Sequence, residues 1–226
     1  MKDINEAIEK LRKYLINEHD KQDEIKNDDF DTKKEQYNRP SKMCLLVANR
    51  IINRTNANNL FRRDCGMNHI QLNGIRLQKV LYLCYLYNLI INKNELFSDD
   101  FEAWFKGPVV SNIYNVFSVT GRDLLPVPMS NSDDKLKNEQ VDLINYVVDS
   151  TIDLSINDLI DFSRISNGPW KMVFNVSGDS QLFPIIENKL LKEYARNNEK
   201  EILNFIEHGI NPICEKKNVK VKNYIK

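Results

Sequence analysis

No stretch of this sequence combines residue types in the spacing that common catalytic sites require. It has no G-x-x-x-x-G-K-[ST] or G-x-G-x-x-G loop for phosphates, and no G-x-S-x-G, H-E-x-x-H or C-x-x-C motif. The three histidines, His19, His69 and His208, lie in separate polar regions. Cys65 and His69 offer two potential metal ligands, whereas a structural zinc site usually has four. We therefore expect no enzymatic activity, no cofactor and no metal site.

The two tryptophans, Trp104 and Trp170, are the side chains best suited to binding another protein. Each stands at a proline-containing turn, in "WFKGP" and in "NGPW". Two interpretations are open. Both indoles fill the core, which is favoured because such residues rarely stay exposed. Alternatively, the two turns meet at a surface groove that binds a protein through aromatic contacts.

The overall charge of the chain does not favour binding to nucleic acid. Lys plus Arg and Asp plus Glu both number 32, so the net charge is zero. Local phosphate contacts are conceivable only through Arg62, Arg63 and the lysines of the C-terminal "KKNVKVKNYIK". The longest apolar run, residues 80–91, has 12 residues and is too short to cross a bilayer. No membrane partner is expected, and the four scattered cysteines suit a reduced, cytoplasmic protein.

Composition divides the chain into four segments. Residues 1–17 predict an amphipathic helix from their apolar spacing. Residues 18–40 carry 13 charges in 23 positions and predict a charged flexible linker. Residues 41–196 form the expected helical domain, and residues 197–226 add a C-terminal helix and a lysine-rich tail.

The hydrophobic pattern of the domain predicts a mainly α-helical fold around one buried central helix, about residues 74–91. This segment is apolar nearly all round, which places it at the centre of a fold. Asn73 is its expected N-cap, and Ser41 is the expected N-cap of a preceding helix. The apolar positions of that helix extend from Cys44 to Ile52, and a polar stretch follows to about residue 72.

A short strand or small β-hairpin is expected near residues 97–106, with Phe101, Ala103 and Phe105 facing one way. Gly107-Pro108 ends it, and Pro108 suits the first turn of a helix that closes at Gly121. The remaining helices are expected at residues 137–150, 155–163, 184–195 and 198–208.

Two motifs in this order resemble those of a known family. The first is Arg76-Leu77-Gln78-Lys79-Val80-Leu81-Tyr82 and the second is Glu102-Ala103-Trp104-Phe105-Lys106-Gly107-Pro108-Val109. Together with "VANRIINRTN", "DLIDFSRISNGPWKMVF" and "PIIENKLLKEYA", they resemble the Panacea domain, the SocA-like antitoxin family. The resemblance covers about residues 44–195. Ser163-Arg164 occupies the region where the family has a histidine.

The resemblance implies a mostly α-helical fold and neutralisation of a bacterial toxin by direct protein–protein binding. One branch of the family acts as an adaptor that delivers the toxin to a protease. The residues expected to form the protein-binding groove or its scaffold are Trp104, Lys106, Gly107, Pro108, Tyr114 and Trp170. The domain also travels on prophages and other mobile elements. An alternative function is therefore inhibition of a host defence effector such as a CRISPR nuclease.

Overall fold

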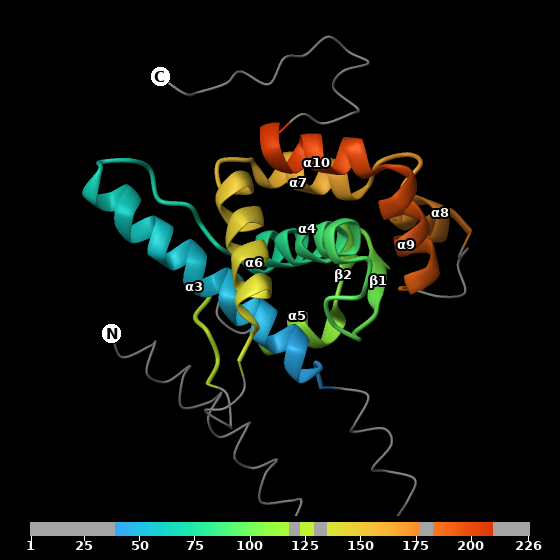
Figure 1. Cartoon of the computed structure of the whole chain (residues 1–226), viewed down its shortest axis with the longest axis horizontal. Helices are drawn as coiled ribbons and strands as arrows, with labels where there is room; N and C mark the ends of the chain where they lie inside the picture. The colour runs from blue at the N-terminus through green and yellow to red at the C-terminus, as the bar shows by residue number, and fades with distance from the viewer. Residues whose placement is uncertain (1–38, 118–122, 129–134, 177–182, 210–226) are drawn as a thin grey trace, which may run out of the picture.

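The computed structural model describes residues 39–117, 123–128, 135–176 and 183–209, and this part of the chain is mainly α-helical (Figure 1). Its helices are α3 (Lys42–Asp64), α4 (Gly74–Asn92), α5 (Ser111–Phe117), α6 (Asn138–Thr151), α7 (Ile156–Ser163), α8 (Pro169–Val176), α9 (Asn188–Asn197) and α10 (Glu199–His208). Three short strands, β1 (Phe101–Trp104), β2 (Gly107–Val109) and β3 (Ile185–Ile186), form an antiparallel sheet in the order β2-β1-β3. The expected fold class is confirmed. The expected helix at residues 1–17, nearly all of the linker and the lysine-rich tail lie outside the described residues.

Helix α4 lies at the centre of the fold, as its sequence predicts. The side chain of Asn73 caps it by accepting a hydrogen bond from the backbone N–H of Arg76 at 3.0 Å. The side chains of Leu77, Leu81 and Cys84 are fully buried. Helices α3, α6, α7, α9 and α10 and strand β2 all contact α4 (Figure 1), which is the environment expected of a helix that is apolar on all sides.

Helix α3 begins where predicted and ends later. The hydroxyl of Ser41 caps it by accepting a backbone hydrogen bond at 3.2 Å. The helix continues through the polar stretch that follows Ile52 and ends at Asp64, beyond the apolar residues that predict it. Polar side chains there have structural partners: the amide of Asn59 exchanges two hydrogen bonds of 2.9 Å with the backbone of Ile70, which returns toward α4. Periodicity of apolar residues cannot detect such a contact.

Strands β1 and β2 form a tight hairpin. Trp104 pairs with Gly107, so the turn consists of the two residues Phe105-Lys106. The prediction that Phe105 faces inward with Phe101 and Ala103 is wrong. Both of those side chains are fully buried, whereas Phe105 is 65% exposed, because the strand ends before it.

Pro108 lies in β2 opposite Ala103, and its predicted place at a helix start is wrong. The N–H of Ala103 donates to the carbonyl of Pro184 at 2.8 Å, away from β2. Because backbone directions alternate along an antiparallel pair, the backbone of Pro108 points away from β1. Proline is tolerated at this outer edge, where no ladder donor is needed. The next helix, α5, begins at Ser111, and its expected end at Gly121 lies outside the described residues.

Strand β3 is not expected from the sequence, which indicates a helix from Pro184. Residues 185–186 instead pair with β1, and α9 begins at Asn188. A strand of two residues is too short to show a period. Helices α7 and α10 follow their expected ranges and pack through the rings of Phe162 and Phe205, whose centroids are 3.9 Å apart. None of the described helices has the length and apolar character needed to cross a membrane.

Candidate functional site

The two motifs singled out in the sequence lie against each other, because the start of α4 holds the outer edge of β2. The side-chain amide of Gln78 donates to the carbonyl of Val110 at 3.2 Å and accepts from its N–H at 2.9 Å. Lys79 Nζ donates to the carbonyl of Pro108 at 2.7 Å. Both polar side chains are 1% exposed, so the loss of either would leave buried groups unpaired. Helix α4 therefore fixes the position of the hairpin.

The ammonium group of Lys79 lies in surroundings that disfavour its charge. Burial, followed by the positive charge of Arg164, lowers its pKa to about 7. Its hydrogen bond to a backbone carbonyl can form in either protonation state, because a neutral amine is still a donor. We interpret Lys79 as a residue that positions the hairpin.

Gly107 allows the hairpin to approach α4 and the end of α7. Its φ is 99°, in the region that favours glycine. A Cβ atom at this position would lie 2.4 Å from Ser163 Oγ and 2.8 Å from Lys79 Nζ. Ser163, at the end of α7, therefore packs against Gly107 of the second motif. Gly107 is part of the scaffold and offers no contact surface.

Trp170 belongs to the core, in agreement with the first interpretation of the tryptophans. It is 1% exposed, and its Nε1 donates to the carbonyl of Trp104 at 2.7 Å. Its ring stacks on Phe174 with centroids 4.5 Å apart, and the guanidinium carbon of Arg164 lies 4.7 Å from the ring centroid. The two proline-containing turns do meet, as the second interpretation requires. Trp170 supports this meeting point from beneath.

Trp104 is half-buried and joins the interior to the surface. Its Nε1 donates to Glu102 at 2.7 Å, and the other carboxylate oxygen of Glu102 accepts from Ser111 Oγ at 2.6 Å. The indole ring stacks on Phe183 with centroids 4.6 Å apart and lies 5.0 Å from the ring of Tyr114. The polar end of the indole is therefore held in place while its faces contact other aromatic rings.

We call the aromatic surface the set of side chains that gather around this indole: Trp104, Phe105, Tyr114, Phe174 and Phe183. The ring of Phe105 lies 5.7 Å from Phe174 and 6.3 Å from Phe183, both edge-on. Phe105 is 65% exposed and Tyr114 is 36% exposed. Exposed aromatic rings that already contact one another are typical of the centre of a protein-binding surface.

The surroundings of the aromatic surface are also partly apolar. Met172 on α8 is 48% exposed and Ile185 on β3 is 51% exposed. Lys106 is exposed in the hairpin turn, while Pro108 is buried beneath it. Of the predicted site residues, Trp104, Lys106 and Tyr114 reach the surface. Gly107, Pro108 and Trp170 are buried and support them.

Sequence reasoning missed Phe105, Phe174 and Phe183 as members of this site. The signal for Phe105 is its place between Trp104 and Gly107, because a hairpin as tight as this one leaves its turn residues exposed. Phe174 stands four residues after Trp170, on the same face of a helix. Nothing in the local sequence places Phe183 against Trp104.

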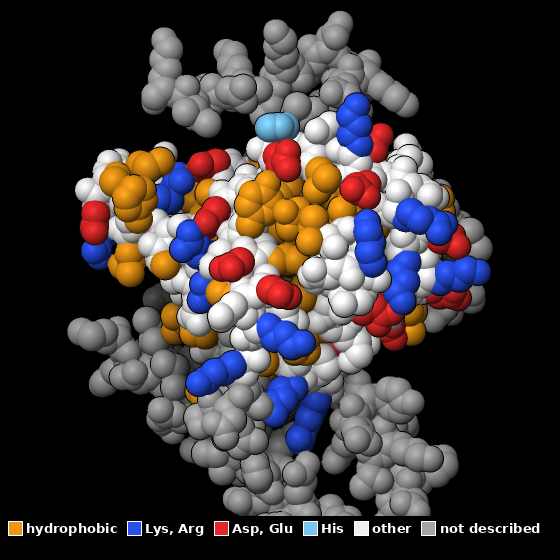
Figure 2. All heavy atoms as spheres, in the orientation of Figure 1, with side chains coloured by type: hydrophobic (Ala, Val, Ile, Leu, Met, Phe, Trp, Pro, Cys, Tyr) orange, Lys and Arg blue, Asp and Glu red, His pale blue; other side chains and the backbone are white. Residues whose placement is uncertain are grey.

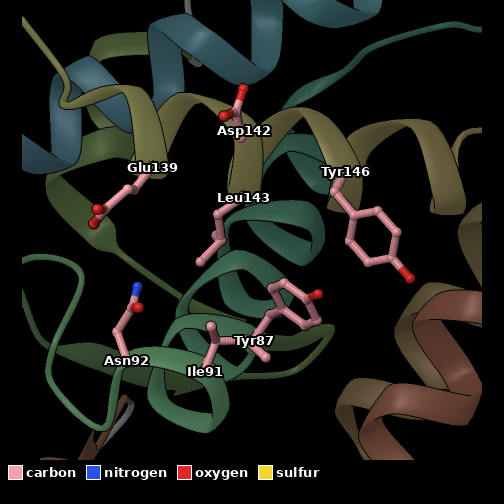
Figure 3. Close-up of a pocket in the computed structure, with 7 residues that line it drawn as sticks. All are labelled: Tyr87, Ile91, Asn92, Glu139, Asp142, Leu143 and Tyr146. Carbon is pink, nitrogen blue, oxygen red and sulfur yellow. The ribbon is translucent and has the colours of Figure 1, made fainter.

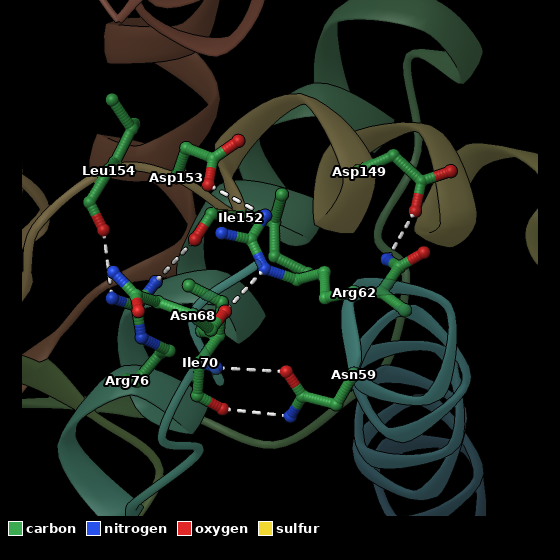
Figure 4. A network of polar contacts seen from close by, with 10 residues as sticks. Asn59, Arg62, Asn68, Ile70, Arg76, Asp149, Ile152, Asp153 and Leu154 are labelled. Atoms are coloured by element: carbon green, nitrogen blue, oxygen red, sulfur yellow. Dashed lines mark hydrogen bonds and ion pairs between the residues drawn. The ribbon is translucent and has the colours of Figure 1, made fainter. Parts of the chain in front are cut away.

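The two arginines considered for phosphate binding have structural partners, and Figure 4 shows those of Arg62. Arg62 donates from Nε to the carbonyl of Asn68 at 2.7 Å and pairs with Asp153 at 2.8 Å, and its side chain is 11% exposed. Arg63 is exposed and pairs with the adjacent Asp64 at 3.0 Å. Arg62 therefore holds the end of α3 in place. The C-terminal lysines lie outside the described residues.

The two potential metal ligands near the end of α3 do not gather with others. His69 Nε2 lies 2.7 Å from a carboxylate oxygen of Asp123, and Cys65 is exposed. Within the described ranges, no three His, Cys, Asp or Glu side chains gather so that they could hold a metal ion.

Comparison with known proteins gives one match. The family model of the antitoxin SocA-like Panacea domain matches residues 77–171. The match includes the second motif, all but the first residue of the first motif, and Trp170, whereas the flanking parts of the resemblance lie outside it. No curated protein and no solved structure matches the chain. Residues 77–171, which include Gln78, Lys79 and the β1–β2 hairpin that they hold, are therefore similar to the SocA-like Panacea domain.

Proposed function

We propose that this protein is an antitoxin that neutralises a cognate toxin by binding it directly through the aromatic surface. The family match supports the antitoxin role. The choice of surface rests on one observation, which is that Phe105 is 65% exposed at the turn of the hairpin. A phenylalanine held at such a turn is suited to insert into an apolar pocket of a partner.

The scaffold beneath the aromatic surface reduces the entropy lost on binding. The hairpin is fixed by hydrogen bonds from Gln78 and Lys79, and Trp104 is fixed at its polar end by Glu102. Side chains that are already ordered lose less rotamer freedom when a partner binds. The toxin would be inhibited by occlusion, which requires no chemistry by the antitoxin. A fall in the cellular level of the toxin on co-expression would add the adaptor role to this mechanism.

The test is co-expression of the chain with the product of the neighbouring gene, with growth rescue and co-purification as readouts. The diagnostic variant is Phe105→Ala. Its matched control is Phe61→Ala, because Phe61 is 66% exposed and lies near the far end of α3, away from the hairpin (Figure 1). We expect the control to rescue growth and Phe105→Ala to bind roughly 10-fold more weakly or worse, as for a central aromatic contact.

Unchanged binding by Phe105→Ala would contradict the choice of surface. A neighbour that is not toxic and forms no complex would contradict the antitoxin role itself. In that case a pull-down from host lysate would test the alternative, inhibition of a host defence effector.

A further inference from the structure

An apolar hollow lies between α4 and α6, beside α10 and outside the aromatic surface. Its volume is about 360 Å³. Figure 2 shows hydrophobic side chains gathered at the centre of the face where these three helices meet. Tyr87 and Ile91 come from α4, and Leu143 and Tyr146 come from α6 (Figure 3). Ile91 is 52% exposed and Tyr146 is 38% exposed, so a substantial apolar area faces outward.

The border of this hollow carries carboxylates. Glu139 and Asp142 on α6 line it, and among the described residues neither side chain has a hydrogen bond or an ion pair. Glu139 lies in the first turn of α6, where a carboxylate is favourable to the helix, but Asp142 lies beyond that turn. On α10, Glu207 lies near Tyr146 and, after burial, raises the pKa of that phenol.

Glu207 lies 3.6 Å from His208 Nε2, whereas no ion pair of the described residues involves Glu139 or Asp142. Lys93, which follows α4, pairs with Glu199 at 3.6 Å. Lys137 stands at the N-cap of α6, where its backbone N–H donates to Gln140 and its carbonyl accepts from Val141. The hollow therefore favours an occupant that combines apolar side chains with positive charge.

The chain itself contains such a segment immediately after α10. Residues 216–226, "KKNVKVKNYIK", hold five lysines and no acid, together with two valines, a tyrosine and an isoleucine. Six residues separate Gly209 from this segment, which allows a reach of up to about 20 Å. Glu207 is two residues before Gly209 and lies near Tyr146, which lines the hollow. A tether this short gives the segment a high local concentration at the site.

We propose that residues 216–226 dock in this hollow, with apolar side chains against Tyr87, Ile91 and Leu143 and lysines near Glu139 and Asp142. The docked segment covers the apolar area that Figure 2 shows as open on this face. The inference does not depend on the proposed function, because the hollow and the aromatic surface share no residue.

Photo-crosslinking of the full chain tests this docking. Tyr224 is replaced by benzoylphenylalanine, the dilute protein is irradiated, and the crosslinked peptides are identified by mass spectrometry. We expect crosslinks within one chain to residues 87–92 or 139–146. Combined Glu139→Lys and Asp142→Lys substitutions should reduce their yield several-fold, because they turn attraction into repulsion.

The matched control is Asp161→Lys with Glu193→Lys, which reverses two exposed carboxylates that do not line the hollow. It should leave the yield unchanged. Thermal unfolding checks each variant, and Glu139→Gln with Asp142→Asn serves if the lysine variant does not fold. Crosslinks to other parts of the chain would overturn the proposal. Equal crosslink yields in the Glu139→Lys, Asp142→Lys variant and in the control variant would also overturn it. A crosslinked dimer whose yield rises with protein concentration would do so too, because it would indicate a second copy of the chain as the occupant.

Discussion

Replacement of Gly107 by alanine probes the contact between the hairpin and its scaffold most directly. The added Cβ would lie 2.4 Å from Ser163 Oγ and 2.8 Å from Lys79 Nζ. The hydroxyl of Ser163 donates to the carbonyl of Ile160 at 2.8 Å, and the amine of Lys79 donates to the carbonyl of Pro108. Both neighbours are therefore anchored, so the new methyl group cannot be accommodated by a free rotation.

Two contributions determine the expected loss of stability. A φ of 99° is unfavourable for an L-residue, by about 1–2 kcal/mol. Forcing a methyl group into a filled site adds about 1–3 kcal/mol. The free energy of unfolding should fall by about 2–5 kcal/mol, a large part of the stability of a typical domain. For a chain of this size the melting temperature should fall by roughly 5–15 °C.

Gly66→Ala is the matched control, because Gly66 also has a positive φ, 68°, but a Cβ there would have nothing within 4 Å. It should lose only the conformational part, about 1–2 kcal/mol. Urea unfolding followed by circular dichroism measures both variants. The double variant Gly107→Ala with Ser163→Ala should lose less than the sum of the single variants, because the shortest contact is removed. Equal losses at Gly107 and Gly66 would refute the claim that the hairpin is tightly packed here.

Three further substitutions test the scaffold. The unfolding free energy of the wild type minus that of Lys79→Met should rise as the pH increases from about 7 toward 10.5. In this range Lys79 keeps its proton in the unfolded chain and loses it in the folded protein. A difference that stays constant with pH in urea unfolding would contradict the burial of its charge. Arg62→Ala should lower the unfolding free energy by about 1–3 kcal/mol and Arg63→Ala by less than about 0.5 kcal/mol. Arg62 contacts both Asn68 and Asp153, whereas Arg63 pairs only with the adjacent Asp64 among the described contacts. Equal melting temperatures of the two variants would show that the Arg62 contacts do not stabilise α3. Trp170→Phe removes the donor to the Trp104 carbonyl and should lower stability by about 1–3 kcal/mol; an unchanged thermal transition would mean that the indole N–H contributes nothing.

The sequence predicts the elements whose causes are local. Helix α4 follows from an all-round apolar segment with Asn73 as its cap, and Ser41 marks the start of α3. The sequence indicates the position of the hairpin but not of its turn. The alternating apolar pattern continues through Phe105, whereas the strand ends at Trp104. The end of α3 was missed because Asn59, a buried polar residue, is satisfied by a segment that comes later in the chain.

The candidate site was less predictable because it depends on contacts between distant segments. The meeting of the two tryptophan turns was one of two open interpretations, and the hydrogen bond from Trp170 to Trp104 spans 66 residues. Phe183 reaches Trp104 only through the fold, and β3 is too short to be seen as a pattern. Which of the two indoles reaches the surface is decided by packing, which composition does not encode.

The hydrogen bonds from α4 to β2 limit how a partner can recognise this protein. Of the outward-facing backbone groups near β2, the carbonyl of Pro108 is taken by Lys79 and both groups of Val110 are taken by Gln78. Proline has no N–H to offer, so a foreign strand cannot extend the sheet at this side. At this edge of the sheet, recognition therefore depends on side chains. Under the proposed function, substitutions at exposed positions such as Phe105 would redirect the protein toward a different partner while the buried framework stays the same, so one scaffold would serve many targets.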